Sequence, residues 1–210
     1  MSFRKEMKST LSSSKLFTLI RWIHSNGGNI LYPDRLVNSV YFDNINLNMY
    51  NHSIEGVLPR KKIRLRIYKK ENSLDIIKST ANLEHKISSV EGRFKISKKN
   101  INSQIDRRIT INDPDYGICS PKLNVIYKRT YYKIKNIRLT IDKDIIYRNI
   151  KHSKILPYKI NDNLNVVELK YSNSNIESKI MNSFPFQFNR FSKYCRGIEF
   201  IQKRRCDEII

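Results

Sequence analysis

Apolar and charged side chains alternate with a period of two along several parts of the chain, which is the pattern of β-strands that bury one face. In residues 62–68 the odd positions are aliphatic and the even positions are basic or polar. Residues 137–142 and 166–171 divide in the same way. Further strand candidates are residues 3–8, 37–43, 83–87, 92–97 and 123–133. Together these segments predict about eight strands.

Helices are expected to be fewer than strands. One is predicted over residues 16–23, where apolar residues recur at i, i+3, i+4 and i+7 before a Gly-Gly pair. Short helices are expected around residues 176–181 and from residue 190 onward. Loops are expected at residues 44–55, 112–117 and 161–165. Neither an internal repeat nor a Pro/Ser-rich linker interrupts the chain, so residues 1–210 are expected to form a single domain.

The chain is strongly basic. It has 40 Lys and Arg against 19 Asp and Glu, a formal net charge of +21. Such a charge predicts an anionic partner: a nucleic acid, an acidic membrane face or a phosphorylated ligand. Hydrophobic residues make up 40% of the chain, enough for an ordinary core, in which Tyr41 and Phe42 are expected to lie.

Several classes of protein are excluded by missing patterns. No apolar run approaches the roughly 20 residues that a membrane-spanning helix needs, and the start lacks the apolar block of a secretory signal. The three cysteines and four histidines are scattered, which argues against a zinc site or a disulfide framework and fits a cytoplasmic protein. The glycine motifs of P-loop and Rossmann proteins are also missing.

The charged faces of the predicted strands share a composition. On these strands the unit E-x-K occurs three times, at residues 6–8, 84–86 and 168–170, and R-x-R occurs at residues 64–66. Charged strand faces usually point to solvent. If the strands close into a barrel, however, these faces converge on a central channel, where like charges repel one another until an anion binds. Arginine favours multidentate phosphate recognition, so the alternative prediction is a tunnel for a heavily phosphorylated ligand.

Eight short segments, taken in chain order, carry a family resemblance. They are FRKEMK (3–8), VNSVYFD (37–43), KIRLRIY (62–68), LEHK (83–86), PKLNVIYKRTYY (121–132), IRLTID (137–142), VVELK (166–170) and FSKYCRG (191–197). Together they resemble the VTC domain, the polyphosphate polymerase branch of the CYTH or triphosphate tunnel superfamily. The resemblance implies an α+β fold, in which an antiparallel eight-stranded triphosphate-tunnel β-barrel has helices packed outside.

The resemblance also implies which residues form the site. Glu168 matches the metal-binding glutamate, which is expected to hold Mn²⁺ or Mg²⁺. Arg93 and Lys95 both match one lysine of the family, and Lys95 is preferred. The expected phosphate-binding residues are Lys8, Arg64, Arg66, Lys86, Lys95, Arg129, Arg138 and Lys193. All of these except Lys8 and Lys95 are also expected to act in catalysis.

The implied activity is transfer of the γ-phosphoryl group of ATP to the end of a growing polyphosphate chain. The hydrolytic branch of the superfamily opens with E-x-E-x-K, whereas this chain has only Glu6 and Lys8, which favours the polymerase branch. The alternatives are a triphosphate hydrolase and a non-catalytic module that binds polyphosphate or an inositol phosphate. Base-specific nucleic-acid recognition is not expected, since no recognition helix or zinc module is present. A membrane partner and an inositol phosphate regulator are left open.

Three of the site residues have an alternative structural role. Glu168 could pair with Lys170, and Arg129 could stack on the tyrosines beside it. Arg138 could neutralise Asp142 on the same strand face.

Overall fold

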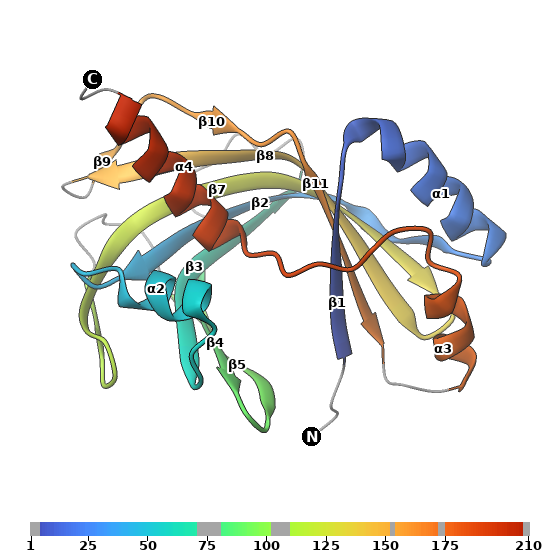
Figure 1. Ribbon diagram of the computed structural model, residues 1–210, viewed down its shortest axis with the longest axis horizontal. Coiled ribbons are helices and arrows are strands. Elements are labelled where there is room, and N and C mark those ends of the chain that lie inside the picture. The colour runs from blue at the N-terminus through green and yellow to red at the C-terminus, as the bar shows by residue number, and fades with distance from the viewer. Residues whose placement is uncertain (1–4, 71–80, 102–109, 152–153, 172–174, 208–210) are drawn as a thin grey trace. The chain divides into compact units, whose positions relative to one another are not determined.

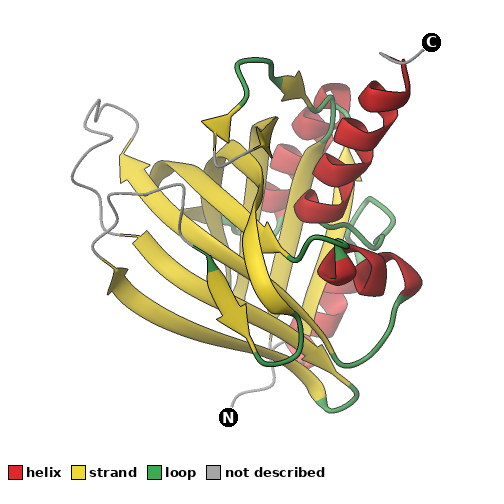
Figure 2. Ribbon diagram, turned by 90° about the vertical axis from the view of Figure 1, so that its left-hand side faces the viewer, coloured by secondary structure: helices red, strands yellow, loops and turns green. Residues whose placement is uncertain are grey.

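The computed structural model describes residues 5–70, 81–101, 110–151, 154–171 and 175–207. Strands make up most of this part and helices are few (Figure 2). The strands are β1 (Lys5–Leu11), β2 (Asn29–Asp43), β3 (Arg60–Lys70), β4 (Ala81–Ser89), β5 (Gly92–Ile101), β6 (Ile111–Asp113), β7 (Gly117–Ile134), β8 (Ile137–Lys151), β9 (Lys154–Ile155), β10 (Ile160–Asn161) and β11 (Asn165–Tyr171). The helices are η1 (Ser13–Lys15), α1 (Leu16–Ser25), α2 (Asn48–Glu55), α3 (Asn175–Asn182) and α4 (Lys193–Asp207).

Most of the strands are joined by antiparallel ladders. Within the described ranges they hydrogen-bond in the order β1-β11-β8-β7-β2-β3-β4-β5, and the short strands β6, β9 and β10 pair with β7 or β8. The β1–β11, β11–β8, β3–β4 and β4–β5 ladders are all antiparallel. The α+β class, the antiparallel sheet and the eight strands along its path are therefore as predicted.

The chain divides into two compact units. The first unit comprises residues 1–36, 127–145 and 162–191, and the second comprises residues 37–126, 146–161 and 192–210. Strands β2, β7 and β8 each contribute residues to both units. The described helices include none that is long and apolar enough to cross a membrane.

The first unit is built on strands with one apolar and one polar face. The apolar faces of β8 and β11 carry Leu139 and Leu169, which are buried in the same core as Trp22 of α1 and Phe184, just after α3. The rings of Trp22 and Phe184 meet edge to face with centroids 5.1 Å apart. The helix predicted over residues 16–23 is confirmed as α1, and Figure 1 shows α1 and α3 beside the strands that they cover. The opposite, polar strand face is left for charged side chains.

The second unit buries one face of β3 and packs α4 against β7 and β8. Ile63, at the centre of β3, is completely buried. Gly197 of α4 lies so close to the sheet that a Cβ atom there would come within 2.6 Å of Leu123 and 2.7 Å of Tyr147. Glycine is therefore needed where α4 approaches the strands.

The loop expected at residues 44–55 is wrong from residue 48 onward, because residues 48–55 form α2. The helix lacks a side-chain cap from its own N-cap residue. Instead the buried Asp43 carboxylate, at the end of β2, accepts hydrogen bonds from the backbone N–H groups of Met49 and Tyr50, both at 3.0 Å. A carboxylate at this position satisfies N–H groups of the first turn and opposes the positive end of the helix dipole.

We expect Asp43→Ala to lower the free energy of unfolding by about 3 kcal/mol, because it removes a fully buried acceptor. Besides the hydrogen bonds from the α2 amides, Asp43 Oδ2 accepts a hydrogen bond from the hydroxyl group of Tyr194, with the two oxygens 2.6 Å apart. Urea denaturation followed by circular dichroism measures the change. Asp115→Ala is the control, since the Asp115 side chain is 67% exposed, and its effect should stay below about 1 kcal/mol. Equal effects of the two substitutions would contradict the capping role.

Candidate functional site

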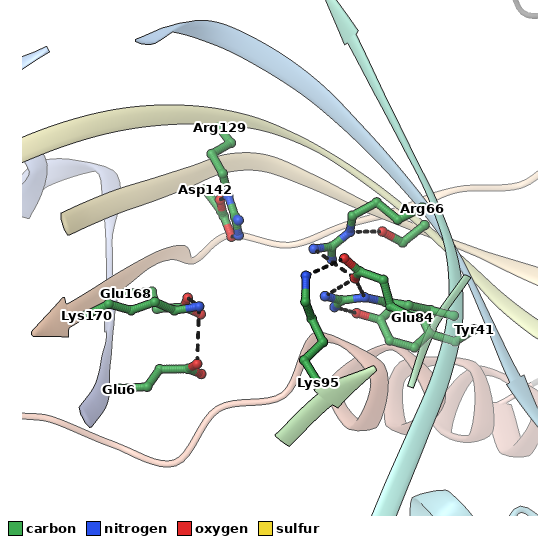
Figure 3. Close-up of polar contacts among 11 residues, drawn as sticks. Glu6, Tyr41, Arg66, Glu84, Lys95, Arg129, Asp142, Glu168 and Lys170 are labelled. Atoms are coloured by element: carbon green, nitrogen blue, oxygen red, sulfur yellow. Dashed lines mark hydrogen bonds and ion pairs between the residues drawn. The ribbon is translucent and has the colours of Figure 1, made fainter. Parts of the chain in front are cut away.

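In each unit a cluster of charged side chains lies on the polar face of the strands. The arginine cluster of the second unit consists of Arg64, Arg66 and Lys95 around Glu84. The carboxylate ring of the first unit consists of Glu6, Lys8, Glu168 and Lys170. Figure 3 shows the arginine cluster together with Glu6, Glu168 and Lys170 of the carboxylate ring.

In the arginine cluster, one buried carboxylate contacts three cations. Arg64 donates from Nε and Nη2 to Oε2 of Glu84, at 2.8 and 2.7 Å. Lys95 Nζ lies 3.1 Å from the other carboxylate oxygen, and Arg66 Nη1 lies 3.7 Å from Oε2. Only 4% of the Glu84 side chain is exposed. The cluster therefore holds three positive charges and one negative charge.

Strand β2 fixes the two guanidinium groups from their other side. Arg66 donates from Nε to Ser39 Oγ at 3.0 Å, and Arg64 donates from Nη1 to the hydroxyl oxygen of Tyr41 at 3.1 Å (Figure 3). Arg66 and Tyr41 are both buried. Side chains held on two sides lose little further rotamer freedom when a ligand binds, so this part of the site is preorganised.

The ladder register explains why these side chains meet. Arg64 of β3 lies opposite Glu84 of β4, and the side chains of one face recur at every second residue. Two residues away on the same face, Lys62 of β3 lies opposite Lys86 of β4. Lys86 in turn lies opposite Lys95 of β5. Directly opposed like charges destabilise a sheet. A row of three lysines is therefore an arrangement that a bound anion stabilises.

Lys62 is the residue of this row that the sequence interpretation did not assign to the site. The sequence did indicate it, since Lys62 occupies an even position of KIRLRIY and therefore lies on the same strand face as Arg64 and Arg66. Lys86 and Lys95 were predicted as site residues, but their placement in one row with Lys62 could not be inferred from the sequence, because the register of β3, β4 and β5 depends on pairing between separate segments.

The cluster changes the acidity of Glu84 strongly. Burial by itself raises the pKa of the Glu84 carboxyl, but the charges of Arg64 and Arg66, the hydrogen bond from Arg64 and the charge of Lys95 outweigh it and lower this pKa to about 2. Glu84 is therefore ionised at any physiological pH.

The phenol of Tyr41 is also affected. Burial raises its pKa, while Arg64, Arg66 and Lys193 together lower it to about 8. The effect of Lys193 puts the start of α4 within electrostatic reach of the arginine cluster. Tyr194, the next residue, stacks on Tyr41 with ring centroids 5.2 Å apart. Tyr41 is thus a core residue, as predicted, but its hydroxyl belongs to the candidate site, which the sequence interpretation missed.

The carboxylate ring joins two E-x-K units from neighbouring antiparallel strands. Glu6 of β1 lies opposite Lys170 of β11, and Lys8 lies opposite Glu168. Lys170 Nζ contacts Glu168 at 2.9 Å and Glu6 at 3.4 Å, while Lys8 Nζ contacts Glu6 at 3.4 Å and Glu168 at 3.8 Å. Two carboxylates and two ammonium groups balance to no net charge. The Glu168–Lys170 pair considered from the sequence is present.

Arg129 and Asp142 form a buried ion pair beside this ring in the first unit. Arg129 donates from Nε and Nη2 to the two carboxylate oxygens of Asp142, the latter at 2.7 Å. Burial lowers the pKa of Arg129, but the paired Asp142 outweighs burial and raises that pKa above its ordinary value. Asp142 thus pairs with Arg129, whereas Arg138 is exposed and lies opposite Lys170 in the ladder.

The predicted site residues therefore fall into two sets. Arg64, Arg66, Lys86, Lys95 and Lys193 belong to the second unit. Lys8, Arg129, Arg138 and Glu168 belong to the first unit. Within the described part of the chain, no group of three or more His, Cys, Asp or Glu side chains is placed to hold a metal ion. Glu6 and Glu168 supply oxygen donors from adjacent strands, which suits a hard divalent cation that keeps water or phosphate as its other ligands.

Comparison with known proteins identifies a family and a fold. The model of the VTC domain family matches residues 3–202. A solved protein from Vibrio parahaemolyticus, described as a candidate adenylate cyclase, is 10% identical; the alignment covers 92% of this chain and 96% of that one, with a TM-score of 0.50. A protein from Hippeastrum, described as a candidate adenylyl cyclase with a dominant triphosphatase activity, is 14% identical; coverage is 95% and 96%, with a TM-score of 0.52. At these identities the likeness shows a shared fold. A search of curated protein sequences found no match.

We expect Glu84→Gln to destabilise the fold in a pH-dependent way. The pKa of about 2 lies below the ordinary value of 4.5, so ionised Glu84 stabilises the protein above about pH 4.5, and this contribution is lost as the pH falls toward 2. The wild type should exceed the variant by on the order of 2 kcal/mol at pH 6, and the difference should shrink by pH 3.

Urea denaturation at both pH values measures this difference. Glu91→Gln, an exposed position in the turn between β4 and β5, is the control and should show little change at either pH. A Glu84→Gln effect that stays constant from pH 6 to pH 3 would show that the carboxylate charge is not what stabilises the cluster.

We expect one of the 12 tyrosines to titrate early, with a midpoint near pH 8, because Arg64 and Arg66 stabilise the Tyr41 phenolate. Near-ultraviolet difference absorbance measures phenolate formation. Tyr41→Phe should remove this early component, whereas Tyr32→Phe, at an exposed ring, should leave it in place. Survival of the component in Tyr41→Phe would overturn the assignment.

Proposed function

The chain belongs to the VTC domain family, and from this membership we propose that it is an ATP-dependent polyphosphate polymerase. It transfers the γ-phosphoryl group of ATP to the terminal phosphate of a growing polyphosphate chain. The observation that carries the proposal is the basic face of β3, β4 and β5, where the lysine row of Lys62, Lys86 and Lys95 lies beside Arg64 and Arg66. This face suits a ligand with several adjacent negative charges.

The chemistry asks little covalent work of the protein. Phosphoryl transfer depends mainly on positioning and on neutralising charge that spreads over the transferred group. The attacking terminal phosphate is already anionic, so a Ser, Cys or His nucleophile is not needed. Arg64 and Arg66 are fixed by hydrogen bonds before substrate binds, and preorganised donors of this kind stabilise the transition state without reorganisation.

The remaining predicted residues take supporting roles in this proposal. Lys8, Lys86, Lys95 and Lys193 bind phosphate groups, and so do Arg129 and Arg138. Glu168, with Glu6 opposite Lys170 in the same ring, holds Mn²⁺ or Mg²⁺. When bound, this cation supplies further neutralisation of phosphate charge. The proposed partners are ATP and polyphosphate, and the proposed setting is cytoplasmic.

A triphosphate hydrolase is the second candidate. The Hippeastrum protein, which shares the fold, is described as having a dominant triphosphatase activity. Hydrolysis and polymerisation differ only in the acceptor of the γ-phosphoryl group, which is water in one case and phosphate in the other. The products therefore distinguish the two candidates.

We expect purified protein with ATP and Mn²⁺ to form a ladder of polyphosphate chains on a gel. Release of inorganic phosphate alone would favour the hydrolase, and tripolyphosphate binding without turnover would favour a non-catalytic module. Arg64→Gln combined with Glu84→Gln leaves the net charge unchanged, and it does not leave a buried carboxylate without its arginine partner. This double variant should lose about 100-fold in rate, because the oriented guanidinium is gone.

Lys98→Gln is the matched control for these assays. Lys98 is exposed on β5 and lies opposite Leu83, on the apolar side of the ladder, away from Lys95. It should keep wild-type activity. Equal losses in Lys98→Gln and the double variant would mean that the activity does not depend specifically on the oriented guanidinium of Arg64.

Binding can be tested without turnover through Tyr41. A bound tripolyphosphate would offset the field of Arg64 and Arg66, so saturation with it should move the early tyrosine midpoint upward from about pH 8. A midpoint that does not move at saturating ligand would place the anion elsewhere.

A further inference from the structure

Two threonine hydroxyls of the first unit are buried without a hydrogen-bond partner. They are Oγ1 of Thr130 on β7 and Oγ1 of Thr140 on β8, and their residues are 7% and 3% exposed. A buried hydroxyl without a partner carries a desolvation penalty, so such groups are rare and call for an explanation. The surroundings of the two hydroxyls differ, and this difference suggests separate roles.

Thr140 lies on the charged face of its strand. Leu139 and Ile141, its chain neighbours, point into the apolar core, so Thr140 points to the opposite face. In the β8–β11 ladder it lies directly opposite Glu168. Asp142 follows two residues later on the same face. The hydroxyl of Thr140 is thus placed beside the carboxylate ring.

Thr130 lies on the other side of the sheet. Its strand alternates so that Tyr132 and Ile134 share its face, and both belong to the apolar core. Arg129, on the opposite face, is the residue that pairs with Asp142. Thr130 therefore has the same orphaned hydroxyl as Thr140, but it lies on the face opposite to Arg129 and away from the carboxylate ring.

The residues around Thr140 suit a hydrated divalent cation. Glu6 and Glu168 are hard oxygen donors on adjacent strands, and the ring that they form with two lysines has no net charge to repel a cation. Mg²⁺ and Mn²⁺ dehydrate reluctantly and keep several water ligands. Those waters need hydrogen-bond acceptors next to the first ligands. An unpartnered hydroxyl opposite Glu168 provides one.

We propose that Thr140 is a positioning residue for the divalent cation of Glu168, and that its hydroxyl accepts a hydrogen bond from a water molecule bound to that cation. This inference rests on the cation site of the proposed function and adds to it a residue outside the predicted set. It explains why a hydroxyl is kept buried without a protein partner on the charged face. It also predicts that removing the hydroxyl affects cation binding and fold stability in opposite directions.

The test compares Thr140→Val, Thr140→Ser and Thr130→Val in the full chain. Mn²⁺ binding is measured by the electron paramagnetic resonance signal of the unbound ion, with and without tripolyphosphate. Thr140→Val should weaken Mn²⁺ binding about tenfold, the usual size of a lost outer-sphere contact, while Thr140→Ser keeps the hydroxyl and the affinity. Thr130→Val removes an equally buried hydroxyl from the apolar side and should bind Mn²⁺ as the wild type does.

Stability without the cation separates this role from a structural one. Valine removes the orphaned hydroxyl at nearly the same shape, so both valine variants should unfold at equal or higher urea concentration than the wild type. Weaker Mn²⁺ binding in Thr140→Val together with unchanged or raised stability supports the proposal. A parallel loss of stability would instead make Thr140 a structural residue and overturn it.

Glu168→Gln distinguishes failure of the inference from failure of the cation site. If Glu168→Gln weakens Mn²⁺ binding and Thr140→Val does not, the cation site stands and the role of Thr140 is refuted. If neither variant changes Mn²⁺ binding, the cation site itself is refuted, and the inference with it. If Thr140→Val leaves Mn²⁺ affinity intact but weakens tripolyphosphate binding, the hydroxyl contacts phosphate and the proposal is wrong.

Discussion

The buried carboxylate of Glu84 is the group on which the arginine cluster depends. Three cations close together on a sheet repel one another, and Arg66 is itself almost fully buried, where an uncompensated charge is costly. Glu84 offsets part of that charge and accepts a two-point hydrogen bond from Arg64. It leaves the cluster positive, because one carboxylate faces three cations. The cluster can thus remain folded without ligand and still attract an anion.

The same cluster is joined to the fold through a short chain of contacts from β2. Tyr41 accepts a hydrogen bond from Arg64 and stacks on Tyr194 of α4. Tyr194 in turn donates to Asp43, the carboxylate that satisfies the first turn of α2. The positions of α2 and α4 and the orientation of Arg64 therefore rest on Tyr41 and Asp43, two side chains of the single strand β2. A substitution in this chain of contacts should alter the site as well as stability.

The sequence predicted what depends on local pattern. Alternation in KIRLRIY placed Arg64 and Arg66 on one face, and the helical spacing from Leu16 onward located α1. It could not predict which side chains meet across strands. Arg138 and Asp142 share a face, but four residues of strand separate them by roughly 13 Å, whereas residues on paired strands lie about 5 Å apart. Asp142 accordingly pairs with Arg129 on the neighbouring strand β7. The start of α2 was missed for a similar reason, since its cap precedes the helix by several residues.

Register also explains how one short motif takes part in two different arrangements of charge. In the first unit two E-x-K units lie antiparallel, so every glutamate faces a lysine and the ring is neutral. In the second unit Glu84 lies opposite Arg64. Lys86 lies between Lys62 on one neighbouring strand and Lys95 on the other. The resulting positive face repels metal ions and attracts phosphate, while the neutral ring can accept a divalent cation without strong opposition. The charge around each E-x-K is therefore decided by the strand beside it, which is why the motif alone does not reveal whether its surroundings are neutral or positive.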